Sequence, residues 1–125
     1  MGRSLRVAAA LAALLWLTAD VEPQSLPANT YPVPLGHCTL SAFSTATLLS
    51  SCTGGIPAKT ACALMVAETN SVRWWDDGTV PTASVGMLWG TGVYWGYLGA
   101  MSKIQFIPST GNATIDVTFY QWACG

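Results

Sequence analysis

Apolar and polar residues alternate along the chain from residue 37 onward, in short runs that lack the three- and four-residue spacing of a helix. Residues 60–68 carry Cys62, Leu64 and Val66 on one face of an extended chain. The alternation is clearest in 113–121, where Ile115, Val117, Phe119 and Gln121 lie opposite Thr114, Asp116, Thr118 and Tyr120. One face is apolar and the other is mostly polar, which is the pattern of a half-buried β-strand.

Turn-forming residues separate these runs, as in "GG" at 54–55 and "GNAT" at 111–114. The pattern predicts eight strands, at 37–42, 45–50, 60–68, 71–75, 84–89, 93–97, 103–107 and 113–121. Short strands at this spacing are typical of an all-β antiparallel sandwich or a jelly-roll-like barrel. In "TLSAFSTATLLSS", residues 39–51, a helix is an open alternative.

The segment "VRWWDDGTVPTASVGML" at 72–88 has two interpretations. Tryptophans beside carboxylates would suit a binding site. The same residues also suit two strands and a connection, because Asp76 and Asp77 can bond the local backbone and Gly78 tolerates a positive φ. We favour the strand–turn–strand interpretation, which predicts a positive φ at Gly78.

The N-terminal part differs from the rest of the chain. Arg3 and Arg6 precede an apolar run at 7–17, which is the layout of a secretory signal peptide, although an apolar assembly helix is an alternative. The run is shorter than the roughly 20 residues that span a bilayer, so no stable membrane span is predicted. Four prolines in 21–36 indicate an extended arm or linker. The predicted organisation is a signal-like or helical segment at 1–20, an arm at 21–36 and a β-domain at 37–125.

Charge is scarce. Only 9% of the residues are charged and the net charge is −1, against about 25% charged residues in an ordinary globular domain. Lysines and arginines are too few and too scattered for a phosphate backbone, so nucleic-acid binding is not expected. A surface so poor in charge suggests burial against a partner or another subunit.

Four cysteines, Cys38, Cys52, Cys62 and Cys124, form an even set. In an exported chain they would pair as two disulfides, with three connectivities open. In a chain that assembles in the cytoplasm they would remain reduced. No Cys-x-x-Cys motif occurs and His37 is the only histidine, so neither a metal nor another cofactor is predicted.

The aromatic residues are the candidates for contact with a partner. Glycines interrupt the segment 89–97 and allow close approach of another backbone, and the candidate contact residues are Trp75, Trp89, Tyr94, Trp95 and Tyr97. Exposed aromatics could alternatively stack on sugars. An enzyme is not predicted, because a nucleophile–base site would depend on His37 and neighbouring turn carboxylates stay solvated.

Five stretches occur in order along residues 32–120: "PVPLG" at 32–36, "IPAKTACALMVAE" at 56–68, "VRWWDDGTVPTASVGML" at 72–88, "YLGAMSKIQFI" at 97–107 and "ATIDVTFY" at 113–120. In these stretches the chain resembles a family of small bacteriophage and prophage proteins with a run like "VRWRDDGTAPTASVGMPL". It departs from that family at Trp75, where an arginine is usual, in the aromatic run "GTGVYWGYL", in its cysteines and in its signal-like N-terminus.

The resemblance implies a virion structural protein with a small β-sandwich. We expect a capsid decoration or stabilising module that acts by assembly, with capsid or other virion proteins as partners and a homo-oligomeric or symmetric arrangement. A phage fibre or tail component is an alternative. A secreted or surface module that binds carbohydrate or another partner is a second alternative, which applies if residues 1–20 are a signal peptide.

Overall fold

The computed structural model describes residues 31–124. The predicted segment 1–20 and most of the predicted arm lie outside the described residues. The strands are β1 (Pro34–Phe43), β2 (Thr47–Leu48), β3 (Cys62–Ala67), β4 (Val72–Trp75), β5 (Met87–Trp89), β6 (Tyr94–Tyr97), β7 (Gln105–Pro108) and β8 (Ala113–Tyr120). The only helical turn in 31–124 is the 3-10 turn η1 (Leu49–Ser51). The all-β fold class is therefore confirmed, and each of the eight strands overlaps a predicted one.

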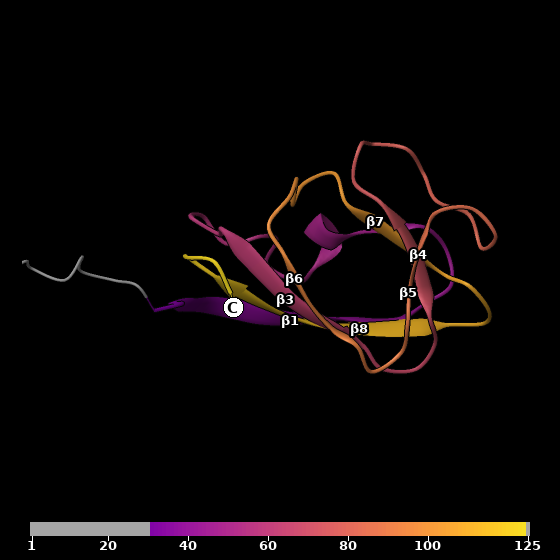
Figure 1. The fold of residues 1–125 in the computed structure, drawn as a ribbon, viewed down its shortest axis with the longest axis horizontal. Helices are drawn as coiled ribbons and strands as arrows, with labels where there is room; N and C mark the ends of the chain where they lie inside the picture. Colours follow the sequence, from indigo (N-terminus) through magenta and orange to yellow (C-terminus); the bar gives the residue numbers. More distant parts are fainter. Residues whose placement is uncertain (1–30, 125) are drawn as a thin grey trace, which may run out of the picture.

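The strands form two antiparallel sheets of four strands each, packed as a sandwich (Figure 1). The first sheet has the order β1-β8-β3-β6, and the second has the order β2-β7-β4-β5. Successive strands often cross between the sheets, so that the short turn after β5 leads into β6 of the opposite sheet. In these orders β5 and β6 are edge strands, each at the end of its own sheet.

The core lies between the inner faces of the sheets. In β8 the alternation predicted from sequence is confirmed: Ala113, Ile115, Val117 and Phe119 are buried. They pack with residues of the second sheet such as Val72 and Phe106. Large apolar side chains of this kind each stabilise a fold by about 1.5–3 kcal/mol when fully buried.

In β3, Leu64 and Val66 share a face with Cys62, as predicted, but this is the outer face of the first sheet. The core face of β3 carries Ala63, Met65 and Ala67. Both faces of this strand are apolar, so alternation alone does not indicate which of them is buried.

The segment 39–51 contains no α-helix. β1 continues to Phe43 through an irregularity in its pairing with β8 between Leu40 and Phe43, where Ala42 has a φ of 44°. The strand predicted at 45–50 is reduced to β2 and is followed at once by η1. At its other end β1 begins at Pro34, so the sheet includes residues that the sequence pattern placed in the arm.

The turn after β4 agrees with the sequence prediction. Gly78 has a φ of 92°, and the Asp77 carboxylate accepts a 2.8 Å hydrogen bond from the Thr79 backbone N–H. At the far end of this connection Gly86 has a φ of 138°. A Cβ there would lie 3.1 Å from Cβ of Arg73, so the chain enters β5 close against β4.

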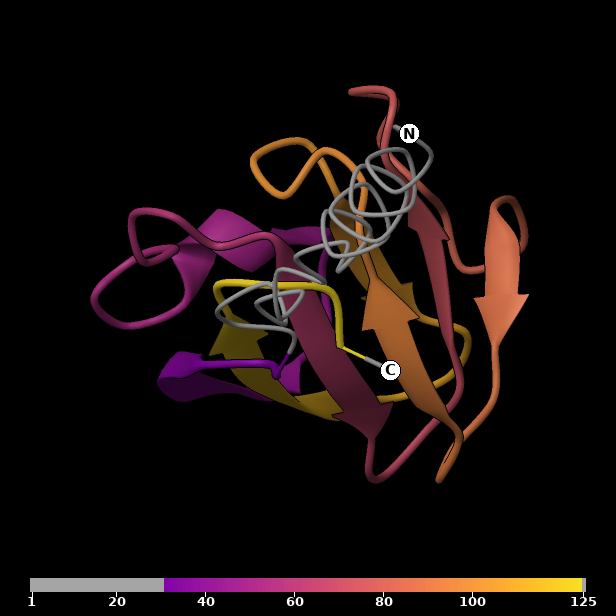
Figure 2. The same cartoon turned by 60° about the vertical axis from the view of Figure 1, so that its left-hand side comes forward.

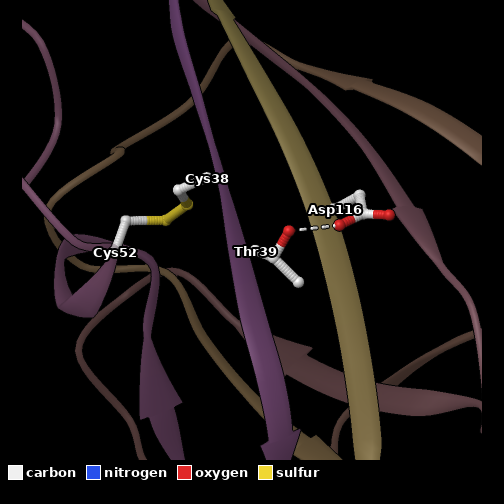
Figure 3. The surroundings of a disulfide bond; sticks show 4 residues. All are labelled: Cys38, Thr39, Cys52 and Asp116. Carbon is white, nitrogen blue, oxygen red and sulfur yellow. Dashed lines mark hydrogen bonds between the residues drawn. A yellow bond between two sulfur atoms is a disulfide. The ribbon is translucent and has the colours of Figure 1, made fainter.

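The four cysteines form two disulfides, Cys38–Cys52 and Cys62–Cys124, with Cα–Cα distances of 5.8 and 5.7 Å. Figure 3 shows Cys38 pointing from β1 toward Cys52, while the next residue, Thr39, points toward Asp116 on β8. Cys38 faces the core, and the first disulfide links β1 to the residue that follows η1. The second ties the C-terminal segment to β3, next to Gly96, where a Cβ would lie only 3.0 Å from the Cys124 carbonyl oxygen.

Candidate functional site

An aromatic cluster fills one side of the sandwich between β4, β5 and β6. The ring centroids of Trp74 and Trp95 are 4.6 Å apart, and those of Trp89 and Trp95 are 5.4 Å apart. Tyr97 lies edge-on to Trp95 at 5.2 Å. The indole N–H of Trp89 donates a 2.9 Å hydrogen bond to the Val93 carbonyl. The cluster therefore joins the two sheets through tilted and edge-to-face ring contacts.

This packing corrects part of the predicted contact surface. Trp89 and Tyr97 are buried, with 6% and 5% of their surface exposed, and cannot supply contact area to a partner. Trp95 is half-buried and packs against the core. The physical reason is strand alternation, which turns Trp89 inward in β5 and Trp95 and Tyr97 inward in β6, with Tyr94 outward. Among the predicted contact residues only Tyr94 is well exposed, at 74%, and Trp75 is half-buried.

The two adjacent aspartates have different partners. Asp76 accepts a 2.9 Å hydrogen bond from the Tyr97 hydroxyl, which ties the turn after β4 to the aromatic cluster. Burial raises the pKa of Tyr97 well above its ordinary value, and the hydrogen bond to Asp76 adds to the shift. The hydrogen bond from the Thr79 backbone N–H lowers the pKa of Asp77. Each carboxylate thus serves the local structure, and the pair does not converge on a common point.

A shallow hollow of about 390 Å³ lies on the outer face of the first sheet. The strand register explains its lining, because Thr39 pairs with Asp116, Asp116 with Val66, and Val66 with Tyr94. These side chains form one row across β1, β8, β3 and β6. The hollow is also lined by His37, Leu64, Glu68 and Thr118.

Two carboxyl groups, those of Glu68 and Asp116, line this hollow. A hydrogen bond to Asp116 raises the pKa of Glu68, and repulsion from the Asp116 charge acts in the same direction. The hydrogen bond from the Thr39 hydroxyl lowers the pKa of Asp116, helped by the bond from Glu68. Sequence reasoning missed this pair, because residues 68 and 116 approach only through the pairing of β3 with β8.

A second missed feature is the exposed apolar side chains at and before β5. Val80, Val85, Met87 and Leu88 are each more than half exposed. The register pairs Leu88 with Arg73, whereas Trp89 pairs with the buried Val72. Leu88 therefore lies on the outer face of the second sheet. The Arg73 guanidinium is held by the carbonyls of Ala83 and Gly86, at 3.0 and 2.9 Å.

Figure 2 shows β5 (salmon) at the outer edge of the sandwich, with β4 on its inner side.

Within residues 31–124 no group of three His, Cys, Asp or Glu side chains is placed to hold a metal ion. Every buried side-chain nitrogen or oxygen described there has a hydrogen-bond partner. The described part of the chain also contains no helix long and apolar enough to cross a membrane. The described residues present two candidate binding surfaces, the hollow on the first sheet and the β5 edge of the second.

Comparison with models of protein families, with curated proteins and with solved structures finds no match to this chain. The resemblance to the phage family therefore rests on the five quoted stretches of 32–120 alone.

Proposed function

We propose that this protein is a structural component of a bacteriophage-type particle, a β-sandwich module that decorates or stabilises a capsid and acts by assembly. The observation that carries the proposal is the contrast between many exposed apolar side chains and few charged ones. Ten large hydrophobic side chains are exposed in residues 31–124, whereas the domain from residue 37 onward contains only seven charged ones. A surface that exposes many apolar side chains and few charged ones favours a protein that works in contact with others.

The interior supports the same proposal. Two disulfides and the aromatic cluster stabilise a small sandwich that would otherwise have a limited core. A rigid module that presents apolar edges suits a repetitive lattice, in which one patch is used many times by symmetry.

The proposal is tested on particles from the organism that carries the gene. Particles banded on a density gradient are digested and analysed by quantitative mass spectrometry. We expect the chain in a fixed ratio to the major capsid protein, and a ratio that survives a second gradient. A chain found only in the supernatant or the culture medium would overturn the proposal.

The second candidate function, a glycan-binding module, is supported by the hollow on the first sheet. Its volume is within the range of small-ligand sites, and Tyr94 presents an exposed ring beside the Glu68 and Asp116 carboxyls. A glycan array would show reproducible binding that Tyr94→Ala removes and Tyr31→Ala, at another highly exposed tyrosine, leaves unchanged. An array with no signal removes this candidate.

A further inference from the structure

We propose that β5 is a self-association surface, on which the β5 of a second copy pairs antiparallel about a two-fold axis near Leu88. The second sheets of two copies would then join into one continuous sheet. This inference deepens the proposed function and rests on it in one respect, because it names a first partner of the assembling module.

The backbone of β5 is suited to such pairing. β5 is the last strand of the second sheet and pairs on one side only, with β4. The other side of an edge strand presents unpaired N–H and C=O groups that can accept another strand. Leu88 is the middle residue of this three-residue strand, so antiparallel pairing centred there brings each Leu88 beside its own copy.

The other three edges are less suited. β1 has irregular pairing at two places, between Pro34 and Gly36 and between Leu40 and Phe43. β2 has only two residues and runs directly into η1. At β6 the C-terminal segment approaches Gly96 closely and is held there by the Cys62–Cys124 disulfide. Bulges, short length and covering segments all protect an edge, and β5 shares only the short length.

The side chains around β5 supply the second argument. Residues 78–102, which contain β5 and β6, include no Asp, Glu, Lys, Arg or His. Four of the ten exposed large hydrophobic side chains in 31–124 lie in β5 or in the connection before it: Val80, Val85, Met87 and Leu88. Natural edge strands are usually guarded by charged side chains, and this edge has none.

Lack of charge also indicates what kind of partner fits. In a two-fold interface every residue meets the same surface on the other copy, so a charged patch would face like charge. The neutral run avoids this penalty. The nearest charged side chain on the neighbouring strand, Arg73, is bound to two carbonyls of its own chain. The surface is therefore electrostatically compatible with itself, whereas a strongly charged partner would gain nothing from it.

The pairing of three-residue strands provides few hydrogen bonds. These bonds fix the register of the two strands, and the apolar side chains must supply most of the affinity. A standard interface buries about 800 Å² on each partner. The exposed side chains of Val80, Val85 and Met87 precede Leu88 in the chain and are available to extend the contact. A reversible dimer, in equilibrium with the monomer, is the expected state of the isolated protein.

The test is sedimentation velocity on the full, oxidised chain over a range of concentrations, for the wild type, Leu88→Lys and Leu88→Asp. We expect a wild-type dimer, and a dissociation constant raised at least about tenfold in each variant alone, because like charges then face each other. An equimolar mixture of the two variants should associate again, since Lys from one copy meets Asp from the other. A variant that merely disturbed the fold would show no such rescue.

The matched control is Tyr31→Asp, which adds the same charge at an exposed aromatic residue. It lies three residues before β1, an edge strand of the first sheet, whereas β5 is an edge strand of the second sheet. It should dimerise like the wild type. If the charged Leu88 variants fail to fold by circular dichroism, Leu88→Gln decides, with an expected weakening smaller than that of a charge. A monomeric wild type, no rescue in the mixture, or equal weakening by Tyr31→Asp would overturn the proposal.

The outcomes also separate this inference from the proposed function. A chain that is monomeric alone but present in fixed ratio in particles refutes self-association at β5 and leaves the virion role intact. A chain that dimerises through Leu88 but is absent from particles refutes the virion role and retains the interface.

Discussion

Leu88 and Trp89 are neighbours in one short strand, yet they belong to different regions of the molecule. Trp89 is 6% exposed and packs in the aromatic cluster between the sheets. Leu88 is 61% exposed and lies on the outer face at an open edge. Both are large and apolar, so hydropathy does not distinguish them. Their different environments follow from strand alternation and from the place of β5 in the sheet order.

The contrast separates two uses of apolar surface. The cluster residues Trp74, Trp89, Trp95 and Tyr97 stabilise the fold by packing on each other and on the core. The residues at the β5 edge add little to the fold, because much of their surface remains in water. They can contribute free energy only when another surface covers them. Substitutions at the two regions should therefore affect different measurements.

The largest effect is expected at Trp89. Trp89→Ala should lower the free energy of unfolding by about 3–5 kcal/mol, because it removes a buried ring and leaves a cavity. Chemical denaturation followed by circular dichroism measures it. Trp89→Phe, which keeps a ring but loses the hydrogen bond to Val93, should cost much less. If Trp89→Ala were as stable as Leu88→Ala, the distinction between the two regions would be wrong.

The disulfides come next. In the chain-entropy model, loss of Cys62–Cys124 costs roughly 4 kcal/mol and loss of Cys38–Cys52 roughly 3 kcal/mol, because the first closes the longer loop. Denaturation of the two double Cys→Ser variants under non-reducing conditions tests this order. Since Cys62–Cys124 also holds the C-terminal segment near β6, its loss should loosen the cluster side of the sandwich more than the β1 side. The reverse order of stabilities would contradict the account.

The turn between β4 and β5 should show a smaller effect. Gly78→Val should cost about 1 kcal/mol or more, because a β-branched residue is strained at a φ of 92°. No other group lies within 4 Å of a Cβ at this position, so the cost is one of backbone conformation and not of packing. A thermal melt measures it. Gly90→Val, at a glycine without a positive φ, is the control, and equal melting temperatures for the two variants would be evidence against the predicted strain.

The smallest effect concerns the hollow on the first sheet. Thr39→Val should raise the pKa of Asp116 toward its ordinary value, because the Thr39 hydroxyl is the main group that lowers it. NMR titration of the side-chain carboxyl carbons measures this pKa. Thr118→Val, in the same hollow, should leave it nearly unchanged. An Asp116 pKa that does not move in Thr39→Val would show that the hydrogen bond has no electrostatic role.

The two carboxyl groups should influence stability in opposite directions. The lowered pKa of Asp116 means that its ionised form stabilises the fold above its unfolded-state pKa, and this contribution is lost as the pH falls through the folded-state pKa. The raised pKa of Glu68 means that its contribution is complete below the unfolded-state pKa and is lost as the pH rises through the folded-state pKa. Their partial cancellation predicts a weak dependence of stability on pH in the acidic range.

Much of the fold could be predicted from local pattern. The positions of the strands, the inner face of β8 and the positive φ at Gly78 all follow from alternation and turn chemistry. The direction of the faces of β3 could not be predicted, because Leu64 and Met65 are both apolar. The pattern gives the period of a strand but not its inner side when both sides would suit a core.

The candidate surfaces were harder to predict for a different reason. Both depend on the order of strands in each sheet, which local sequence does not specify. Glu68 and Asp116 meet because β3 pairs with β8, and the outward-facing Leu88 lies at an open edge because β5 has a neighbour on one side only. The charge-free run 78–102 is visible in the sequence and, together with an edge position, would have pointed to the surface. The aromatic content of 89–97 predicts contact with a partner, whereas Trp89, Trp95 and Tyr97 pack inside the aromatic cluster.

The most direct test of this account is hydrogen–deuterium exchange at the backbone amides of Met87–Trp89, measured at low and high protein concentration on the oxidised full chain. If the β5 edge is the assembly surface, these amides should become more protected as the concentration rises, whereas those of the interior strand β3 should be protected at both concentrations. Exchange at β5 that does not change with concentration, in a protein that sediments as a dimer, would contradict the account and would locate the contact on another face.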